Sequence, residues 1–117
     1  MARIRSQLRL ALPQREWLDL RIAGRVQRAL PVSGSTDRIL LLSWAAESQP
    51  LIRNVARVDR HGNVVWRAEL PGKSESDCYV DLRQEGDEYV ARTYSEWEVR
   101  LDTDGVIRSI RRASAMT

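Results

Sequence analysis

The sequence has few of the residues on which catalytic and metal sites depend. Among 117 residues it has one cysteine, one histidine and no phenylalanine. A lone cysteine excludes an internal disulfide and favours a reducing compartment, so we expect a cytoplasmic protein. Cys78 is expected to be a small buried hydrophobe and His61 a solvated turn residue. Two such residues are too few for a zinc site, and we expect no metal and no cofactor.

Long apolar runs and the usual catalytic motifs are missing as well. The longest apolar run, ILLLSWAA at 39–46, is too short to span a bilayer. The N-terminal segment lacks the continuous apolar block of a secretory signal, so we expect neither a signal nor a membrane span. There is no G-x-S-x-G elbow, and no glycine-rich phosphate loop of either common pattern. These absences favour a protein that is not an enzyme.

The charge pattern is basic in total but mixed in order. Lysines and arginines number 19 against 16 acids, and all but Lys73 are arginine. Arginine suits phosphate and carboxylate partners because its planar fork donates hydrogen bonds in pairs. Nucleic-acid binding by an arginine-rich sheet face is therefore one possible function. However, no basic run is longer than Arg111-Arg112, and a phosphate-binding face needs clustering. A solvated mixed surface is the simpler interpretation.

The dominant hydrophobic period is two, and no segment keeps a convincing period of 3.6. Leu8, Leu10 and Leu12 alternate with polar or small residues, as do Trp97, Val99 and Leu101. Such alternation is typical of antiparallel strands with one wet face. The run RILLLSW is apolar on both faces and should form the most buried strand. The predicted strands cover residues 4–12, 16–23, 25–30, 38–44, 52–59, 63–70, 78–84, 88–94, 96–102 and 106–112.

Two of these strand pairs are joined by turns of the same pattern, D-x-x-G. Asp59–Gly62 lies between VARV and NVVWRAEL, and Asp102–Gly105 lies between EVRL and VIRSI. Asp at the first turn position can accept hydrogen bonds from backbone amides, and Gly at the fourth supplies the left-handed conformation that closes the hairpin. We therefore predict one all-β domain over residues 1–117, a two-sheet sandwich or partly open barrel. Blade-like repeats are expected near 38–70 and 78–112.

The stretch ARVDRHGNVVW resembles the blade repeat of quinoprotein-type β-propellers, in which an Asp–Gly turn precedes a strand carrying a tryptophan. Those positions are Asp59, Gly62 and Trp66 here. A complete propeller needs at least four blades of about forty residues, for which the chain is too short. The string from Trp97 to Gly105 is also similar to small uncharacterised bacterial β-proteins built from tandem hairpins. This second resemblance implies the fold and no activity.

The candidate binding residues are Arg92, Tyr94 and Trp97, which flank the end of a predicted hairpin. Tyrosine, tryptophan and arginine dominate binding hot spots, so this cluster could bind a protein partner or stack a nucleobase. We favour a protein-interaction domain, for example an inhibitor or immunity-type binder, which could also form a homodimer through strand edges. A third possibility is a ligand or hydrolytic pocket between the sheets that uses Glu96 or Glu98. Cross-strand pairing of those glutamates with arginines is the simpler expectation.

Overall fold

The computed structural model describes residues 25–43 and 50–113, and all regular structure in these ranges is β-strand. The predicted strands 4–12 and 16–23 lie outside the described residues. No helix in the described part of the chain is long and apolar enough to cross a membrane. The strands are β1 (Val26–Pro31), β2 (Arg38–Leu42), β3 (Leu51–Ile52), β4 (Val55–Val58), β5 (Val64–Arg67), β6 (Asp77–Glu85), β7 (Glu88–Thr93), β8 (Trp97–Leu101) and β9 (Ile107–Arg112).

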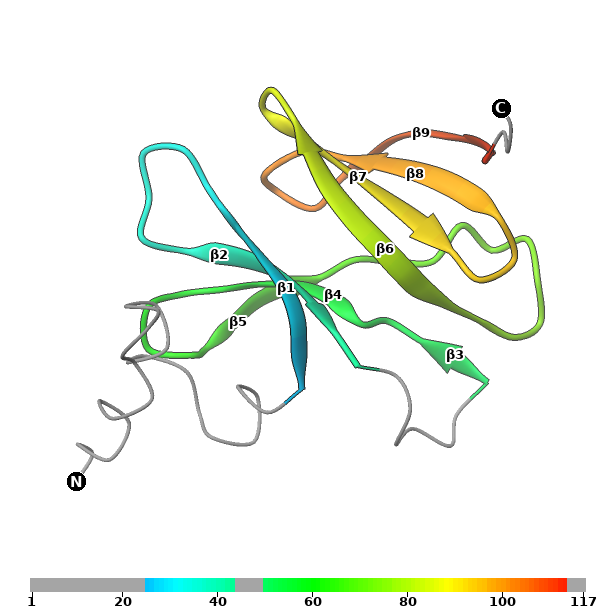
Figure 1. Cartoon of the computed structure of the whole chain (residues 1–117), viewed down its shortest axis with the longest axis horizontal. Helices are drawn as coiled ribbons and strands as arrows, with labels where there is room; N and C mark the ends of the chain where they lie inside the picture. The colour runs from blue at the N-terminus through cyan, green and yellow to red at the C-terminus, as the bar shows by residue number, and fades with distance from the viewer. Residues whose placement is uncertain (1–24, 44–49, 114–117) are drawn as a thin grey trace.

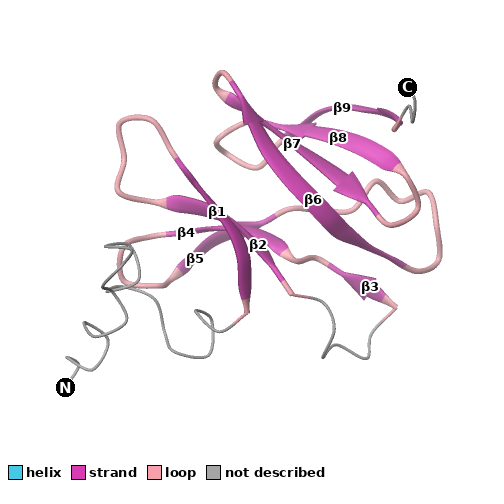
Figure 2. Ribbon diagram, viewed as in Figure 1, coloured by secondary structure: helices cyan, strands magenta, loops and turns pink. Residues whose placement is uncertain are grey.

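The strands form two sheets that pack on each other as an all-β sandwich, and neither sheet closes into a barrel (Figures 1 and 2). One sheet has the order β1-β2-β4-β5 and is antiparallel throughout. The other has the order β3-β6-β7-β8-β9, in which only the short β3 runs parallel to its neighbour. The fold class predicted from the alternation is thus confirmed.

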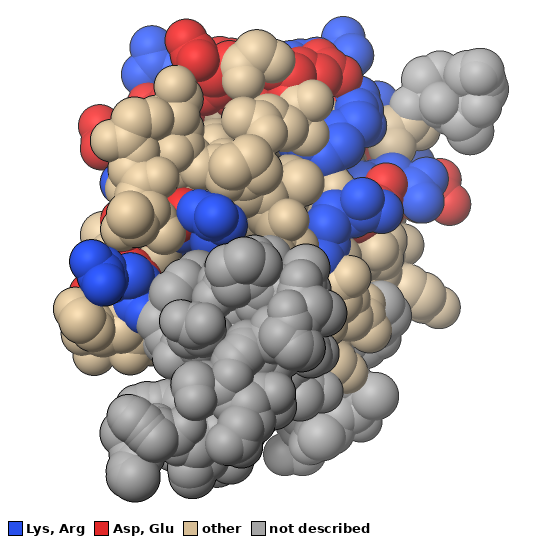
Figure 3. Space-filling model, turned by 60° about the vertical axis from the view of Figure 1, so that its left-hand side comes forward, with Lys and Arg blue, Asp and Glu red and all other residues tan. Residues whose placement is uncertain are grey.

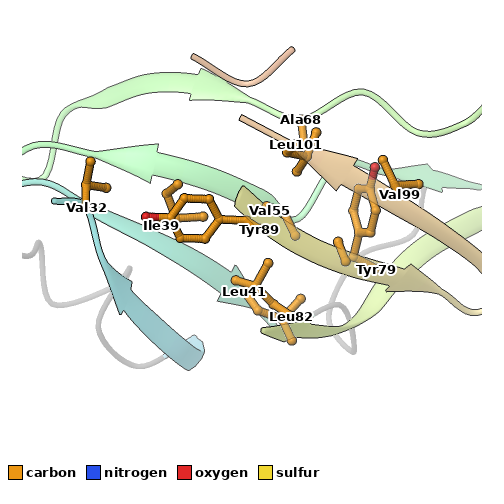
Figure 4. Close-up of a cluster of buried hydrophobic side chains, with 11 residues drawn as sticks. Val32, Ile39, Leu41, Val55, Ala68, Tyr79, Leu82, Tyr89, Val99 and Leu101 are labelled. Atoms are coloured by element: carbon orange, nitrogen blue, oxygen red, sulfur yellow. The ribbon is translucent and has the colours of Figure 1, made fainter. Parts of the chain in front are cut away.

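The main core lies between the two sheets (Figure 4). Ile39 and Leu41 of β2 belong to the same buried cluster as Leu82 of β6 and Leu101 of β8, and all four are at most 3% exposed. Burial of each such side chain is worth about 1.5–3 kcal/mol relative to its exposure. The strand β2 carries a second cluster on its other face, including Leu40, which is fully buried. The strand part of the RILLLSW segment, Arg38–Leu42, therefore places apolar side chains on both faces of the sheet, as predicted.

Two buried tyrosines tie the sheets together across this core. The Tyr89 hydroxyl on β7 donates a hydrogen bond of 2.6 Å to the carbonyl oxygen of Pro31 on β1. The Tyr79 hydroxyl on β6 donates to the carbonyl oxygen of Glu69, which follows β5. A buried phenol needs such an acceptor, because an unmade hydrogen bond leaves its full desolvation cost uncompensated. Each tyrosine therefore fixes both the spacing and the relative position of the sheets.

Asn54 explains why the strand predicted over 52–59 is interrupted. Its buried amide donates from Nδ2 to the carbonyl oxygens of Leu42 (2.9 Å) and Tyr79 (2.8 Å), and its Oδ1 accepts from the Tyr79 backbone amide (2.8 Å). These bonds join the end of β2 to β6. The chain consequently leaves one sheet at β3 and enters the other at β4, on either side of this residue.

The two D-x-x-G turns have the predicted geometry and the same hydrogen bonds. Oδ1 of Asp59 accepts from the backbone amides of the residues two and four positions later, and Oδ1 of Asp102 does the same. Gly62 and Gly105 both have positive φ, 85° and 80°. Each turn closes a hairpin that forms one end of its own sheet, β4–β5 in the first and β8–β9 in the second.

The indole of Trp66 on β5 joins the first hairpin to the second turn. Its Nε1 donates a hydrogen bond of 3.0 Å to the carbonyl oxygen of Thr103, which also accepts from Arg57 at 2.8 Å. The ring lies directly on Gly105, where an added Cβ would stand 2.6 Å from the indole. Glycine is therefore required at position 105 both for the positive φ and for the close approach of the ring.

Candidate functional site

The β7–β8 turn presents Tyr94 to solvent at 75% exposure, the highest among the exposed large hydrophobic residues of the described chain. The turn closes through a hydrogen bond from the Glu96 backbone amide to the carbonyl oxygen of Thr93 (3.0 Å). The Thr93 hydroxyl accepts from the backbone amide of Trp97 (2.9 Å). In each D-x-x-G turn, the aspartate carboxylate accepts the equivalent hydrogen bond from the backbone amide four positions later.

Glu96 occupies the fourth position of this turn, where the other two turns have glycine. Its φ is 72°, and it is the one non-glycine residue with positive φ in the described chain. A left-handed conformation costs an L-residue with a Cβ roughly 1–2 kcal/mol. Such strain persists only where the surroundings over-determine the backbone, and it is frequent at binding sites.

Asp77 supplies part of that constraint from the neighbouring strand. This carboxylate is only 6% exposed and accepts hydrogen bonds from the backbone amide (3.1 Å) and hydroxyl (2.6 Å) of Ser95. It also accepts from the backbone amide of Cys78 at 3.0 Å. The start of β6 therefore holds the tip of the β7–β8 turn, and Tyr94 projects from a rigid support.

Trp97 begins β8 immediately after the turn and has two cations over its ring. The guanidinium carbon of Arg112 lies 4.8 Å from a ring centroid, and Nζ of Lys73 lies 5.6 Å from it. Both distances are within the range of cation–π attraction. Arg112 reaches the ring because it is the register partner of Trp97 on β9. We call Lys73, Tyr94, Trp97 and Arg112 the aromatic–cation surface.

Arg92 lies at the same end of the sheet but on the opposite face. Its neighbours along β7, Ala91 and Thr93, are buried and belong to the face that packs on the core, whereas Arg92 is exposed. Because side chains alternate along a strand, Arg92 points away from the core. Of the three candidate binding residues, the structure thus places Tyr94 and Trp97 at the turn and Arg92 on the outer face behind it.

That outer face carries a chain of alternating charges across β6 to β9. Its contacts run in sequence from Arg111 to Glu98 (2.6 Å), Glu98 to Arg83 (3.1 Å), Arg83 to Glu85 (2.9 Å), Glu85 to Arg100 (2.8 Å) and Arg100 to Glu88 (3.4 Å). Val90 lies between Arg83 and Arg100 in the register and is only 1% exposed. The arginine stems therefore cover apolar surface while their heads are paired.

Glu96 and Glu98 do not form the carboxylate pair considered for a hydrolytic pocket. Glu96 belongs to the turn and not to the strand, because β8 begins at Trp97. Glu98 accepts hydrogen bonds from Arg111 and Arg83, which hold its pKa below the ordinary value. A general acid would need the opposite shift. The simpler expectation, cross-strand pairing with arginines, is confirmed for Glu98.

Cys78 and His61 are the two other residues whose side chain types often take part in catalysis. Burial raises the pKa of the Cys78 thiol, and the adjacent Asp77 carboxylate raises it further. A nucleophilic cysteine requires a lowered pKa, so Cys78 is an inert thiol, buried as predicted. His61 is exposed in the β4–β5 turn, also as predicted, and its backbone amide donates to Asp59.

One pocket of about 270 Å³ lies where the ends of β2, β3 and β4 meet. Neither Glu96 nor Glu98 lines it. Asn54 is part of its lining, and the amide of this residue donates to the carbonyl oxygens of Leu42 and Tyr79. The complete lining is Arg25, Leu42, Leu51, Ile52, Arg53, Asn54 and Arg67.

The described chain is a small all-β sandwich that presents an aromatic turn at one end of a sheet. A family model described as "Domain of unknown function (DUF7957)" matches residues 19–108, and the chain belongs to this family. A search of curated proteins finds no match. A search of solved structures also finds none.

Proposed function

We propose that this domain is a non-enzymatic binding module that uses the turn carrying Tyr94, together with Trp97, to hold a protein partner. The observation that carries the proposal is the exposure of Tyr94 on a turn whose backbone is strained at Glu96 and anchored by buried Asp77. Tyrosine on a rigid support supplies contact area at a low entropy cost on binding. An inhibitor or immunity-type binder would use such a surface. A cytoplasmic location and a bacterial origin remain predictions.

Nucleic-acid binding by the outer sheet face has less support. Three of its arginines are already hydrogen-bonded to glutamates, so a phosphate would have to displace a carboxylate from each. On the side of the molecule seen in Figure 3, acidic (red) and basic (blue) side chains are both present among the described residues. Phosphate-dominated binding would fall steeply with salt, which separates this alternative from a protein partner.

The test replaces Tyr94 with a photo-crosslinking phenylalanine analogue in the full chain and exposes it to an extract of the native host. Val106, exposed at 48%, is the control position, because it lies in the β8–β9 turn at the opposite end of β8. We expect one protein to be crosslinked at position 94 and not at 106. The recombinant partner, identified by mass spectrometry, should bind Tyr94→Ser at least tenfold more weakly than wild type, about 1.4 kcal/mol. Recovery of RNA or DNA without a crosslinked protein would contradict the proposal.

We propose β5 as the edge for the homodimer. It is the last strand of its sheet within the described residues, and Val64 and Val65 on it are 45% and 52% exposed. Arg67 is the one charged residue of β5, and an edge strand whose other exposed side chains are apolar is open to pairing with a second copy. Sedimentation velocity should show dimerisation that rises with concentration and is lost in Val65→Lys. A wild-type chain that stays monomeric at millimolar concentration would contradict the dimer.

A further inference from the structure

The strand β9 is a free edge with a basic character. Within the described chain its one strand neighbour is β8. The backbone amide of Ala113 donates to Glu96, which sets the hydrogen-bonding phase of this pair. Because residues of an antiparallel pair alternate between bonding toward and away from the partner strand, Ile110 and Arg112 direct their amides and carbonyls outward. An extended segment could pair with these groups.

The charges beside this edge are not balanced. Arg111 is paired with Glu98 at 2.6 Å, but neither Arg112 nor Lys73 has an acidic side chain within ion-pair distance among the described residues. Both cations lie within cation–π distance of the same indole. An anionic side chain of a ligand would give either cation the opposite charge that the described residues do not supply. The edge therefore combines backbone groups that no described strand pairs with and two cations that have no acidic partner among the described residues.

We propose that the β9 edge and the aromatic–cation surface bind an extended acidic segment of a protein partner, which adds to the five-stranded sheet as a sixth strand. The inference rests on the proposed function and names the chemistry of the partner. Backbone groups of the segment pair with Ile110 and Arg112, as in other cases of strand addition. Carboxylates two residues apart on one face of the segment lie against Lys73 and Arg112.

A peptide fits this surface better than a single-stranded nucleic acid. A strand edge offers alternating donors and acceptors at the spacing of a polypeptide backbone, which a sugar–phosphate chain does not match. A nucleobase stacked on Trp97 would have to displace Arg112, which already lies over the ring at 4.8 Å. Charge complementarity and backbone pairing thus both point to an acidic polypeptide.

The test uses fluorescein-labelled nine-residue peptides and the full chain, with binding followed by fluorescence anisotropy at low salt. One peptide alternates glutamate and threonine, a second alternates lysine and threonine, and a third is the acidic peptide with alternate backbone nitrogens methylated. We expect the acidic peptide to bind at least tenfold more tightly than either of the others. The first comparison tests charge, and the second tests backbone pairing with the edge.

Substitutions then locate the site. Arg112→Gln and Lys73→Gln should each weaken the acidic peptide threefold or more, whereas Arg60→Gln on the exposed β4–β5 turn should leave it unchanged. Circular dichroism melting of each variant shows that the fold is retained. Equal losses in the Arg60 and Arg112 variants would overturn the inference, because attraction would then follow net charge alone. An unaffected N-methylated peptide would overturn strand addition, and tighter binding of oligothymidine would favour nucleic acid.

These outcomes are distinguishable from those that test the proposed function. If crosslinking through position 94 yields a protein partner but the acidic peptide does not bind, Tyr94 remains a binding residue and the β9 inference is wrong. If the acidic peptide binds at Arg112 while Tyr94→Ser has no effect on any partner, the edge remains a binding site and the role of the turn is wrong.

Discussion

The β4–β5 and β8–β9 turns share one backbone geometry and differ in their surroundings. Asp59 and Asp102 accept the same two backbone hydrogen bonds, and both turns end on a glycine with positive φ. The second turn, however, is held by the first hairpin, because the carbonyl oxygen of Thr103 accepts from Arg57 and Trp66. Local sequence thus determines the shape of each turn. The residues packed against a turn determine how much the stability of the protein depends on that turn.

The β7–β8 turn extends the comparison to a third case. It has the same closing hydrogen bond from the fourth residue to the first, but threonine replaces aspartate and Glu96 replaces glycine. Thr93 accepts only from the residue four positions later, Trp97. The backbone amide of Ser95, two positions after Thr93, donates instead to Asp77 on β6. Two turns are thus encoded locally, and the third depends on a tertiary contact. The third is also the turn that carries the proposed binding tyrosine.

The largest expected effect is that of Gly105→Ala. The substitution combines an unfavourable positive φ, roughly 1–2 kcal/mol, with a Cβ only 2.6 Å from the Trp66 ring, for which overpacking adds about 1–3 kcal/mol. Gly86→Ala, with φ of 62° and open space around the added Cβ, is the matched control and should show the backbone cost alone. Urea denaturation with an unchanged m-value measures both. Equal losses in the two variants would mean that the Trp66 contact is unimportant.

A smaller effect is expected for Trp66→Phe. The aromatic ring is kept, but the hydrogen bond to the carbonyl oxygen of Thr103 is lost, while Arg57 still donates to that oxygen. The free energy of unfolding should fall by about 1 kcal/mol. This loss of stability should be the same whether or not the β4–β5 turn is also mutated, because the indole is hydrogen-bonded to the β8–β9 turn. A variant as stable as wild type would show that Arg57 alone holds the turn.

Glu96→Gly should stabilise the protein by about 1 kcal/mol, because glycine adopts positive φ without the Cβ penalty. Part of this gain is offset by the greater freedom of glycine in the unfolded chain. Glu96→Ala is the control, since it removes the carboxylate but keeps the Cβ, and it should give no such gain. Thermal melting followed by circular dichroism separates the two. If the glycine variant is less stable than the alanine variant, the backbone at 96 is not strained.

The smallest expected effect concerns the titration of Asp59. The backbone amide of Asn63 donates to this carboxylate and holds its pKa below the ordinary value of 3.8. A lowered folded-state pKa means that the contribution of the group to stability is present above the unfolded-state pKa and is lost as the pH falls through the folded-state pKa. Carbon-detected NMR should therefore give a midpoint below 3.8 in the protein, and the ordinary value in a peptide covering 57–65. Equal midpoints would contradict the turn hydrogen bonds.

The elements that sequence predicted well are those determined by local chemistry. Alternation located eight strands of the described chain to within a few residues, and Asp59 and Asp102 marked their turns because aspartate and glycine act within four residues. The interruption at Asn54 could not be predicted, because its amide bonds to groups 12 and 25 positions away. A buried polar residue of this kind has no signature in the hydrophobic pattern.

The candidate site was predictable only in part, for the same reason. Tyr94 and Trp97 follow from the position of a hairpin end, but the arginine on the tryptophan is Arg112 and not Arg92. Counting outward from Gly105 pairs Trp97 with Ile110, whereas the observed partner is Arg112. The register shifts by one residue at the turn and by one more between Arg100 and Leu101. No signal in the sequence identifies Lys73 either, because it reaches the ring from the connection between the sheets.

The side chain of Asn54 has a consequence for the chemical ageing of the protein. Hydrolysis of its amide to a carboxylate would remove both donors and direct an acceptor at the carbonyl oxygens of Leu42 and Tyr79. Replacement of the amide nitrogen by an oxygen would thus separate β2 from β6 at the point where the chain passes between the sheets. Long-term storage should consequently produce a loss of folded protein in proportion to deamidation at this position, which mass spectrometry can follow.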